Sequence, residues 1–199
     1  GKYEAEKNFF RFSLFVSFFP QLVQGPISRF DHLAQSLYEE HKYNATTVAS
    51  GLQRILWGYF KKMVIADRML VAVNTLIQSP EEYYGAYAFA GMLFYALELY
   101  ADFTGGIDIT IGISELFGID VKENFVRPFF SKSIAEYWRR WHITMGEWFK
   151  DYIFYPLSVL PSVLRFSKKL RKKLGEGVGR RYPVYLATIV TWFVTGVWH

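Results

Sequence analysis

The longest mostly apolar stretch of the chain, residues 84–118, constrains the fold more than any other feature. It reads YGAYAFAGMLFYALELYADFTGGIDITIGISELFG. Its length suits a membrane-spanning helix of about 20 residues, and the Gly105-Gly106 pair predicts a break before a second helix. We therefore expect an all-α, polytopic membrane protein with spanning helices and additional re-entrant or interfacial helices.

Four carboxylates interrupt this apolar stretch. Glu98 and Asp102 are four residues apart and share one helix face, and Asp108 and Glu115 lie two turns apart on another. Because a charge that faces lipid costs about 3 kcal/mol at the bilayer centre, these groups should face protein, an aqueous cavity or each other. They either tie helices together through buried hydrogen bonds or take part directly in chemistry.

The segments before this stretch differ in polarity. Residues 8–30 are apolar and aromatic until prolines and a glycine interrupt them, as at the end of a spanning helix that runs into a loop. Residues 31–45 are polar and predict a loop. Residues 46–78 lack proline and predict one long helix with a polar centre or two shorter helices. The Asn-Ala-Thr triplet at 44–46 matches a glycosylation sequon, although the start of a helix explains it better.

A basic run precedes the last apolar segment. Residues 165–181 hold eight Lys or Arg residues and one Glu, and residues 182–199 carry no charge before the final His199. Such a run can bind nucleic acid or form a disordered tail, but short basic loops beside membrane spans stay in the cytoplasm. We therefore predict a cytoplasmic loop, contact with membrane lipid and no nucleic acid. His199 would then lie about 25 Å further along, deep in the membrane or near its outer face.

Composition narrows the chemistry. Aromatic residues make up 20% of the chain, a share that suits membrane interfaces, where one end of a ring is dry and the other wet. Cysteine is absent, which excludes disulfides, thiol nucleophiles and Cys-ligated metals. The chain starts without an initiator Met or a signal-peptide layout and ends directly after an apolar run. We expect residues 1–199 to be a single fragment of one membrane domain, truncated at both ends.

A histidine lies inside the Trp-rich segment 138–152, which follows a proline-broken connector. Its sequence is WRRWHITMGEWFKDY. On one helix, the apolar positions fall in a single arc, made of Trp138, Trp141, Met145, Trp148 and Tyr152. His142 lies at the edge of that arc. The pattern predicts an amphipathic helix in the membrane interface, with His142 as a boundary residue.

His199 ends an otherwise uncharged segment, and an ionisable residue in such a place is a functional candidate by default. Histidine suits proton transfer near neutral pH, because its unperturbed pKa is about 6.5. The chain has four His residues, no Cys and no HExxH spacing, so we predict no metal site.

Five stretches, in this order, resemble the membrane-bound O-acyltransferase (MBOAT) family, in its bacterial branch of alginate O-acetyltransferases and D-alanyl-teichoic-acid transferases. They are FFPQLVQGPISRF at 18–30, FKKMVIADR at 60–68, YADFTGGIDITIGISELFGI at 100–119, ENFVRPFFSKSIAEYWRRWHITMGEWFKDYIFYPL at 123–157 and GVWH at 196–199. The pairing of WRRWH with GVWH is the most specific part of the resemblance.

The resemblance implies a fragment of the MBOAT fold in the bacterial cytoplasmic membrane. It implies that His199, which follows Gly-x-Trp, is the catalytic histidine and that His142 lines the same membrane-crossing tunnel. Other branches carry Asn or Asp at the earlier position, so an orienting role fits His142 better than a second-base role. The other residues expected to line the tunnel or contact substrate are Trp198, Asp102, Asn124, Arg139, Arg140, Trp138 and Trp141.

The implied reaction moves an acetyl or D-alanyl group from a thioester to a hydroxyl. His199 would accept the hydroxyl proton, an assistance worth roughly 10² to 10⁴ in rate. The donor would be a cytoplasmic thioester of coenzyme A or of a carrier-protein phosphopantetheine, with no bound cofactor. The acceptor would be an extracytoplasmic polysaccharide or teichoic acid, and an extracytoplasmic acyltransferase is a further expected partner. The run 165–181 can attract an anionic donor as well as lipid headgroups.

A membrane transporter or channel subunit is the main alternative, because intramembrane carboxylates and a buried histidine also suit an ion path. A scaffold is a third, since interfacial aromatic helices also form partner surfaces. Both leave the paired Trp-His motifs without an explanation. The sequence does not choose between an acetyl and a D-alanyl donor.

Overall fold

The computed structural model describes residues 5–199, and their regular structure is helical, with no strand in that range. The all-α fold class is therefore confirmed. The chain divides into two compact units, residues 1–126 and residues 127–199. Within residues 5–199, no helix combines the length and the apolar character needed to cross a membrane. The polytopic arrangement stays a prediction.

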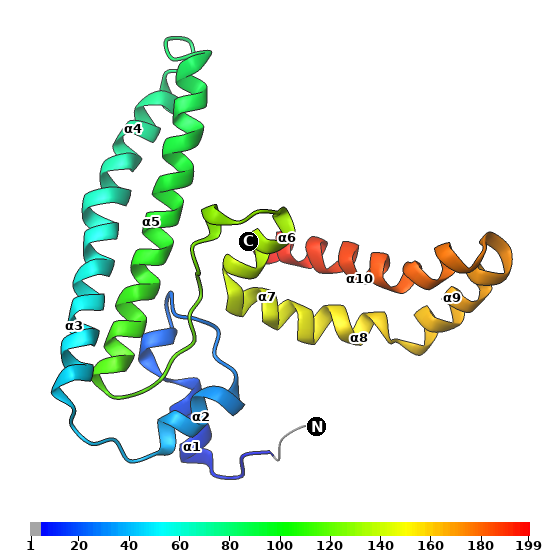
Figure 1. The fold of residues 1–199 in the computed structure, drawn as a ribbon, viewed down its shortest axis with the longest axis horizontal. Coiled ribbons are helices and arrows are strands. Elements are labelled where there is room, and N and C mark those ends of the chain that lie inside the picture. Colours follow the sequence, from blue (N-terminus) through cyan, green and yellow to red (C-terminus); the bar gives the residue numbers. More distant parts are fainter. Residues whose placement is uncertain (1–4) are drawn as a thin grey trace. The chain divides into compact units, whose positions relative to one another are not determined.

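The first unit is built on a long helical pair. α3 (Ala45–Tyr59), the π-helix η2 (Phe60–Ala66) and α4 (Asp67–Gln78) follow one another, and α5 (Ala86–Leu116) packs along all three (Figure 1). The side chain of Asn44 caps α3 by accepting from the backbone N–H groups of residues 46 and 47 at 2.9 and 3.3 Å. The helix start predicted at 44–46 is confirmed, and the polar centre of the predicted long helix falls on η2.

The predicted break at Gly105-Gly106 is wrong, because α5 is one continuous helix of 31 residues. Glycine serves here for close approach between helices. A Cβ atom on Gly58 would lie 2.6 Å from the carbonyl oxygen of Gly105, and a Cβ on Gly51 would lie 2.7 Å from that of Gly112. The two glycine pairs let the backbones of α3 and α5 nearly touch, and the packing gained outweighs the low helix propensity of glycine.

Ion pairs join the same two helical segments. Arg54 of α3 contacts Asp108 at 3.1 Å and Glu115 at 3.3 Å, both on α5. Lys61, in η2, is buried and lies 2.5 Å from Asp108, and its neighbour Lys62 lies 2.6 Å from Asp102. Three of the four carboxylates in the apolar stretch therefore join helices to each other. This is the first of the two roles that the sequence predicts for them.

Short helices complete this unit. α1 (Phe9–Val16) and the 3₁₀ turn η1 (Phe19–Gln21) agree with a helix that runs into a proline-broken loop. The loop predicted for 31–45 is wrong at its start, because α2 (Phe30–Tyr38) occupies that part. Its apolar residues recur with helical spacing and bury Leu33 fully against a cluster that includes Ile107 and Ile111 of α5.

The second unit contains the Trp-rich and basic segments. Its elements in chain order are η3 (Pro128–Phe130), α6 (Ile134–Arg140), α7 (Ile143–Phe149), the π-helix η4 (Lys150–Phe154), α8 (Tyr155–Ser158), α9 (Pro161–Leu174) and α10 (Glu176–Trp198). α10 runs back along α9, passes α8 and η4, and ends beside α6 (Figure 1).

Residues 165–181 are helical except at Gly175, and the placement of this run on the cytoplasmic side stays a prediction. Lys, Arg and Leu are good helix formers, and proline at the first helical position starts α9 without losing a needed hydrogen bond. Gly175, with φ of +90°, is the one non-helical residue between α9 and α10. The hydroxyl of Ser167 donates to the carbonyl of Gly179 at 2.6 Å and pins the two helices together.

Candidate active site

The Trp-rich segment turns sharply at its histidine. Residues 138–152 do not form the predicted single amphipathic helix, because α6 ends at Arg140 and α7 begins at Ile143. Trp141 is extended and stacks on Tyr137, with ring centroids 5.6 Å apart. His142 adopts a left-handed conformation with φ of +45°, which is uncommon for a residue other than glycine. The turn therefore directs the imidazole away from the course of α6.

Aromatic contacts hold the end of α10 against this turn. Trp192 packs edge-on against Trp138 of α6, with centroids 5.0 Å apart. Trp198 packs on Trp148 and Phe149 of α7, at 5.7 and 5.8 Å. Edge-to-face aromatic pairs each add about 0.5–1.5 kcal/mol beyond the area they bury. These contacts fix the register of the last two turns of α10 and bring its final residue to the α6–α7 turn.

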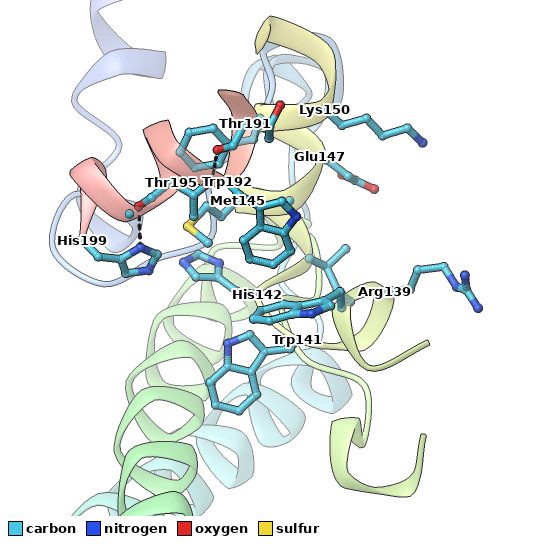
Figure 2. A pocket seen from close by; sticks show the side chains of 15 residues that line it. Arg139, Trp141, His142, Met145, Glu147, Lys150, Thr191, Trp192, Thr195 and His199 are labelled. Carbon is cyan, nitrogen blue, oxygen red and sulfur yellow. Dashed lines mark hydrogen bonds between the residues drawn. The ribbon is translucent and has the colours of Figure 1, made fainter. Parts of the chain in front are cut away.

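The two histidines line one cavity of about 710 Å³, which lies within the second unit. Figure 2 shows their rings beside each other, with the sulfur of Met145 close to both. The walls come from α6, the turn, α7, the first residue of η4 and the last two turns of α10. Besides the histidines they include Trp138, Arg139, Trp141, Met145, Glu147, Lys150, Thr191, Trp192 and Thr195.

A backbone hydrogen bond assigns the tautomer of His199. Its Nδ1 lies 2.7 Å from the carbonyl oxygen of Thr195, one turn earlier on α10 (Figure 2). A carbonyl oxygen can only accept, so Nδ1 carries the proton and donates. In the neutral ring, Nε2 then holds the lone pair and is able to take a proton. The side chain of His199 is exposed in this structure, and its predicted place, deep in the membrane or near the outer face, stays a prediction.

His142 is kept neutral. Burial, together with the neighbouring His199, lowers the pKa of His142 to about 4. At neutral pH its ring therefore carries no charge and has one donor nitrogen and one acceptor nitrogen. A neutral, half-buried ring held by a left-handed backbone is suited to orienting a polar group in the cavity.

The structure brings five of the predicted site residues to the cavity, and the others have separate contacts. Those at the cavity are His142, His199, Trp138, Arg139 and Trp141. Trp198 packs behind it on α7, and Arg140 turns to Glu136 at 2.5 Å. Asp102 pairs with Lys62, and Asn124 is fully buried. Both belong to the first unit, so their part in the site stays a prediction.

Sequence reasoning missed the α10 wall of the cavity. Thr191, Thr195 and His199 are spaced by four residues and share one helix face, next to Trp192. That spacing is visible in the sequence and identifies the residues that accompany His199. Among residues 5–199, no group of three or more His, Asp or Glu side chains is placed to hold a metal ion.

The fold and the cavity define a class: an all-helical protein in which a histidine of the α6–α7 turn and a histidine at the end of α10 line one cavity. Comparison with known protein families identifies the family. The family model for membrane-bound O-acyltransferases matches residues 6–170, a range that contains His142. The chain belongs to the membrane-bound O-acyltransferase family.

Individual relatives agree with this assignment. The chain is 32% identical, over its whole length, to the probable alginate O-acetylase AlgI of Azotobacter vinelandii. It is 32% identical over 96% of its length to the peptidoglycan O-acetyltransferase of Helicobacter pylori, and 29% identical over 95% to the teichoic acid D-alanyltransferase of Bacillus subtilis. It spans 36%, 34% and 46% of these three relatives, respectively.

Proposed function

We propose that the protein of which these residues are part is a membrane-bound O-acyltransferase that uses His199 as its general base. It moves an acetyl or D-alanyl group from a thioester to a hydroxyl of a cell-surface polymer. The observation that carries the proposal is the hydrogen bond from Nδ1 of His199 to the Thr195 carbonyl, since it leaves Nε2 ready to accept a proton in a cavity shared with His142.

In the reaction, the acceptor hydroxyl donates its proton to Nε2 as its oxygen attacks the thioester carbonyl. The tetrahedral intermediate collapses, the carbon–sulfur bond breaks, and the imidazolium returns the proton to the departing thiolate. The thiol and the new ester are the products. General-base assistance contributes about 10² to 10⁴ in rate, and holding donor and acceptor in one cavity supplies a further part.

Neutral His142 orients the reactants in this scheme. Its ring has both a donor and an acceptor nitrogen at neutral pH, and a neutral group beside His199 does not oppose the positive charge that develops there. The protein is a multi-pass protein of the inner membrane. The donor is a thioester of coenzyme A or of a carrier-protein phosphopantetheine, and it enters the site from the cytoplasmic side. The three relatives are named for acetyl and for D-alanyl transfer, so both donors belong in the assay.

The test is acyl transfer by the full-length protein in membranes, measured with labelled acetyl-coenzyme A and with D-alanyl carrier protein. We expect His199→Ala to lower the rate by at least about 10²-fold at unchanged expression. Thr188→Ala is the matched control, because this threonine lies on α10 and bonds to Val184 outside the cavity wall. Transfer by His199→Ala at the wild-type rate would overturn the proposed role.

A further inference from the structure

We propose that the α9–α10 hairpin is a binding surface for anionic phospholipid headgroups. The inference concerns a surface apart from the histidine cavity, and it holds whether or not the protein transfers acyl groups. It starts from the seven cations of the hairpin that are exposed and lie outside the Arg171–Glu176 contact: Arg165, Lys168, Lys169, Lys172, Lys173, Arg180 and Arg181.

The packing of the hairpin fixes where these cations lie. α9 turns Val163 and Ser167 inward, where Ser167 bonds to Gly179. A Cβ on Gly179 would lie 2.5 Å from the backbone nitrogen of Arg171, so the two helices are in close contact. With one face buried in this way, the helical repeat places Lys168, Lys169 and Lys172 on the opposite, outward face. The positive charge of α9 is therefore concentrated on the outward face of that helix.

Apolar side chains accompany the charge. Leu164, Phe166, Leu174 and Val178 are each between 42% and 62% exposed, and Phe166 packs against Tyr182, with ring centroids 5.1 Å apart. A helix with basic residues on one side and Phe and Leu beside them is typical of helices that lie at a lipid interface, with the charges at the headgroups and the apolar groups below.

The second helix of the hairpin, α10, has a charged first part and an uncharged remainder. α10 carries charges up to Arg181, and from Tyr182 to Trp198 it carries none. Val184, Tyr185, Ile189 and Phe193 in this part are 48% to 70% exposed. In a lipid leaflet, charged headgroups lie at the surface and hydrocarbon lies beneath them. The charged start of α10, followed by exposed apolar side chains, matches that order. An acidic protein partner would be matched by the charge alone, so the exposed apolar residues favour lipid.

The experiment compares lipid selectivity in reconstituted bilayers. The full chain is placed in phosphatidylcholine bilayers that contain traces of spin-labelled phosphatidylglycerol or spin-labelled phosphatidylcholine, and electron paramagnetic resonance gives the relative association of the two probes. We expect wild type to favour phosphatidylglycerol by about threefold or more. Because each Lys or Arg near an anionic surface adds attraction that salt screens, the preference should shrink in 0.5 M NaCl.

Matched variants locate the effect. Lys168→Gln, Lys169→Gln and Lys172→Gln combined should bring the ratio close to one. Lys7→Gln, Lys42→Gln and Arg68→Gln combined remove the same charge from exposed positions elsewhere and should leave it unchanged. The triple Lys→Arg variant at 168, 169 and 172 should keep the preference, and helix content by circular dichroism checks that each variant folds.

Two results would overturn the proposal. One is equal association of the two lipid probes with wild type. The other is a ratio that falls equally in both triple Gln variants, which would reflect net charge and not the hairpin. Adding unacylated holo acyl carrier protein to the same samples tests the competing occupant. Binding that needs Lys168, Lys169 and Lys172, with no lipid preference, would assign the surface to an acidic protein instead.

Discussion

At the scale of single residues, one backbone torsion decides where His142 points. Its left-handed conformation is of a kind that costs roughly 1–3 kcal/mol and persists only where the surroundings impose it. Here the stacking of Trp141 on Tyr137 and the start of α7 impose it. The sequence marks His142 through its WRRWH motif, but helical periodicity places it on a continuous helix. Periodicity cannot foresee a turn that tertiary packing enforces.

The lowered pKa of His142 makes a prediction about stability. Histidine titrates near 6.5 when unfolded and near 4 in this structure. Between these values the unfolded state binds more protons, so stability falls as pH drops from about 6.5 towards 4. We expect the Tm of wild type to fall more steeply over this interval than that of His142→Asn.

Asparagine is the appropriate replacement, because it tolerates the left-handed conformation and does not titrate. The Tm of the two proteins is measured in parallel from pH 7.5 to pH 4, and one curve is subtracted from the other. The contribution of the carboxylates is common to both proteins and cancels in this difference. If the two curves of Tm against pH ran parallel, the lowered pKa of His142 in the folded protein would be contradicted.

At the scale of elements, the sequence predicts most helices and misplaces several of their ends. The cap at Asn44 follows from local chemistry and is confirmed. Gly105-Gly106 predicts a break because glycine weakens a helix locally, but in the structure Gly105 allows close contact with a second helix, which one segment of sequence does not show. The basic run at 165–181 predicts a side of the membrane from its charge, whereas its helical structure follows from the helix propensity of Lys, Arg and Leu.

The glycine contact between α3 and α5 can be tested directly. In Gly58→Ala, the added Cβ would lie 2.6 Å from the Gly105 carbonyl oxygen, so the helices must separate. Overpacking of this kind typically costs about 1–3 kcal/mol. We expect a lower Tm in thermal unfolding followed by circular dichroism.

Gly177→Ala is the control for this change. Gly177 lies in α10, and a Cβ there meets nothing within 4 Å. Alanine in a helix is favoured over glycine by about 0.5–1 kcal/mol, so this variant should be as stable as wild type or more so. If both variants shifted Tm equally, the cost would not come from the contact between the helices.

At the scale of the whole molecule, the pairing of two distant motifs predicted the site better than any single segment did. WRRWH and GVWH belong to different helices, and the cavity brings both histidines together. Asp102 and Asn124 belong to the first unit, and their part in the site stays a prediction. Thr195 carries neither a charge nor a ring, so patterns of charged and aromatic residues do not place it in the cavity wall.

Membership of a membrane-bound family predicts how the full-length protein fractionates. We expect it to stay in the membrane pellet after extraction at pH 11 and to be released by detergent, because integral proteins are held by buried apolar surface and not by charge. Immunoblots of pellet and supernatant read the outcome, with a peripheral membrane protein as the control that alkaline extraction releases. Complete release of the protein at pH 11 would contradict a multi-pass arrangement.

The most direct measurement of the central claim is chemical rescue of His199→Gly in the full-length protein, assayed by acyl transfer with and without added imidazole. If His199 supplies the base, the variant should lose at least about 10²-fold in rate, and imidazole entering the vacated space should restore part of it, with a rate that rises as more of the imidazole is unprotonated. Transfer by the variant at the wild-type rate, with no response to imidazole, would contradict the account.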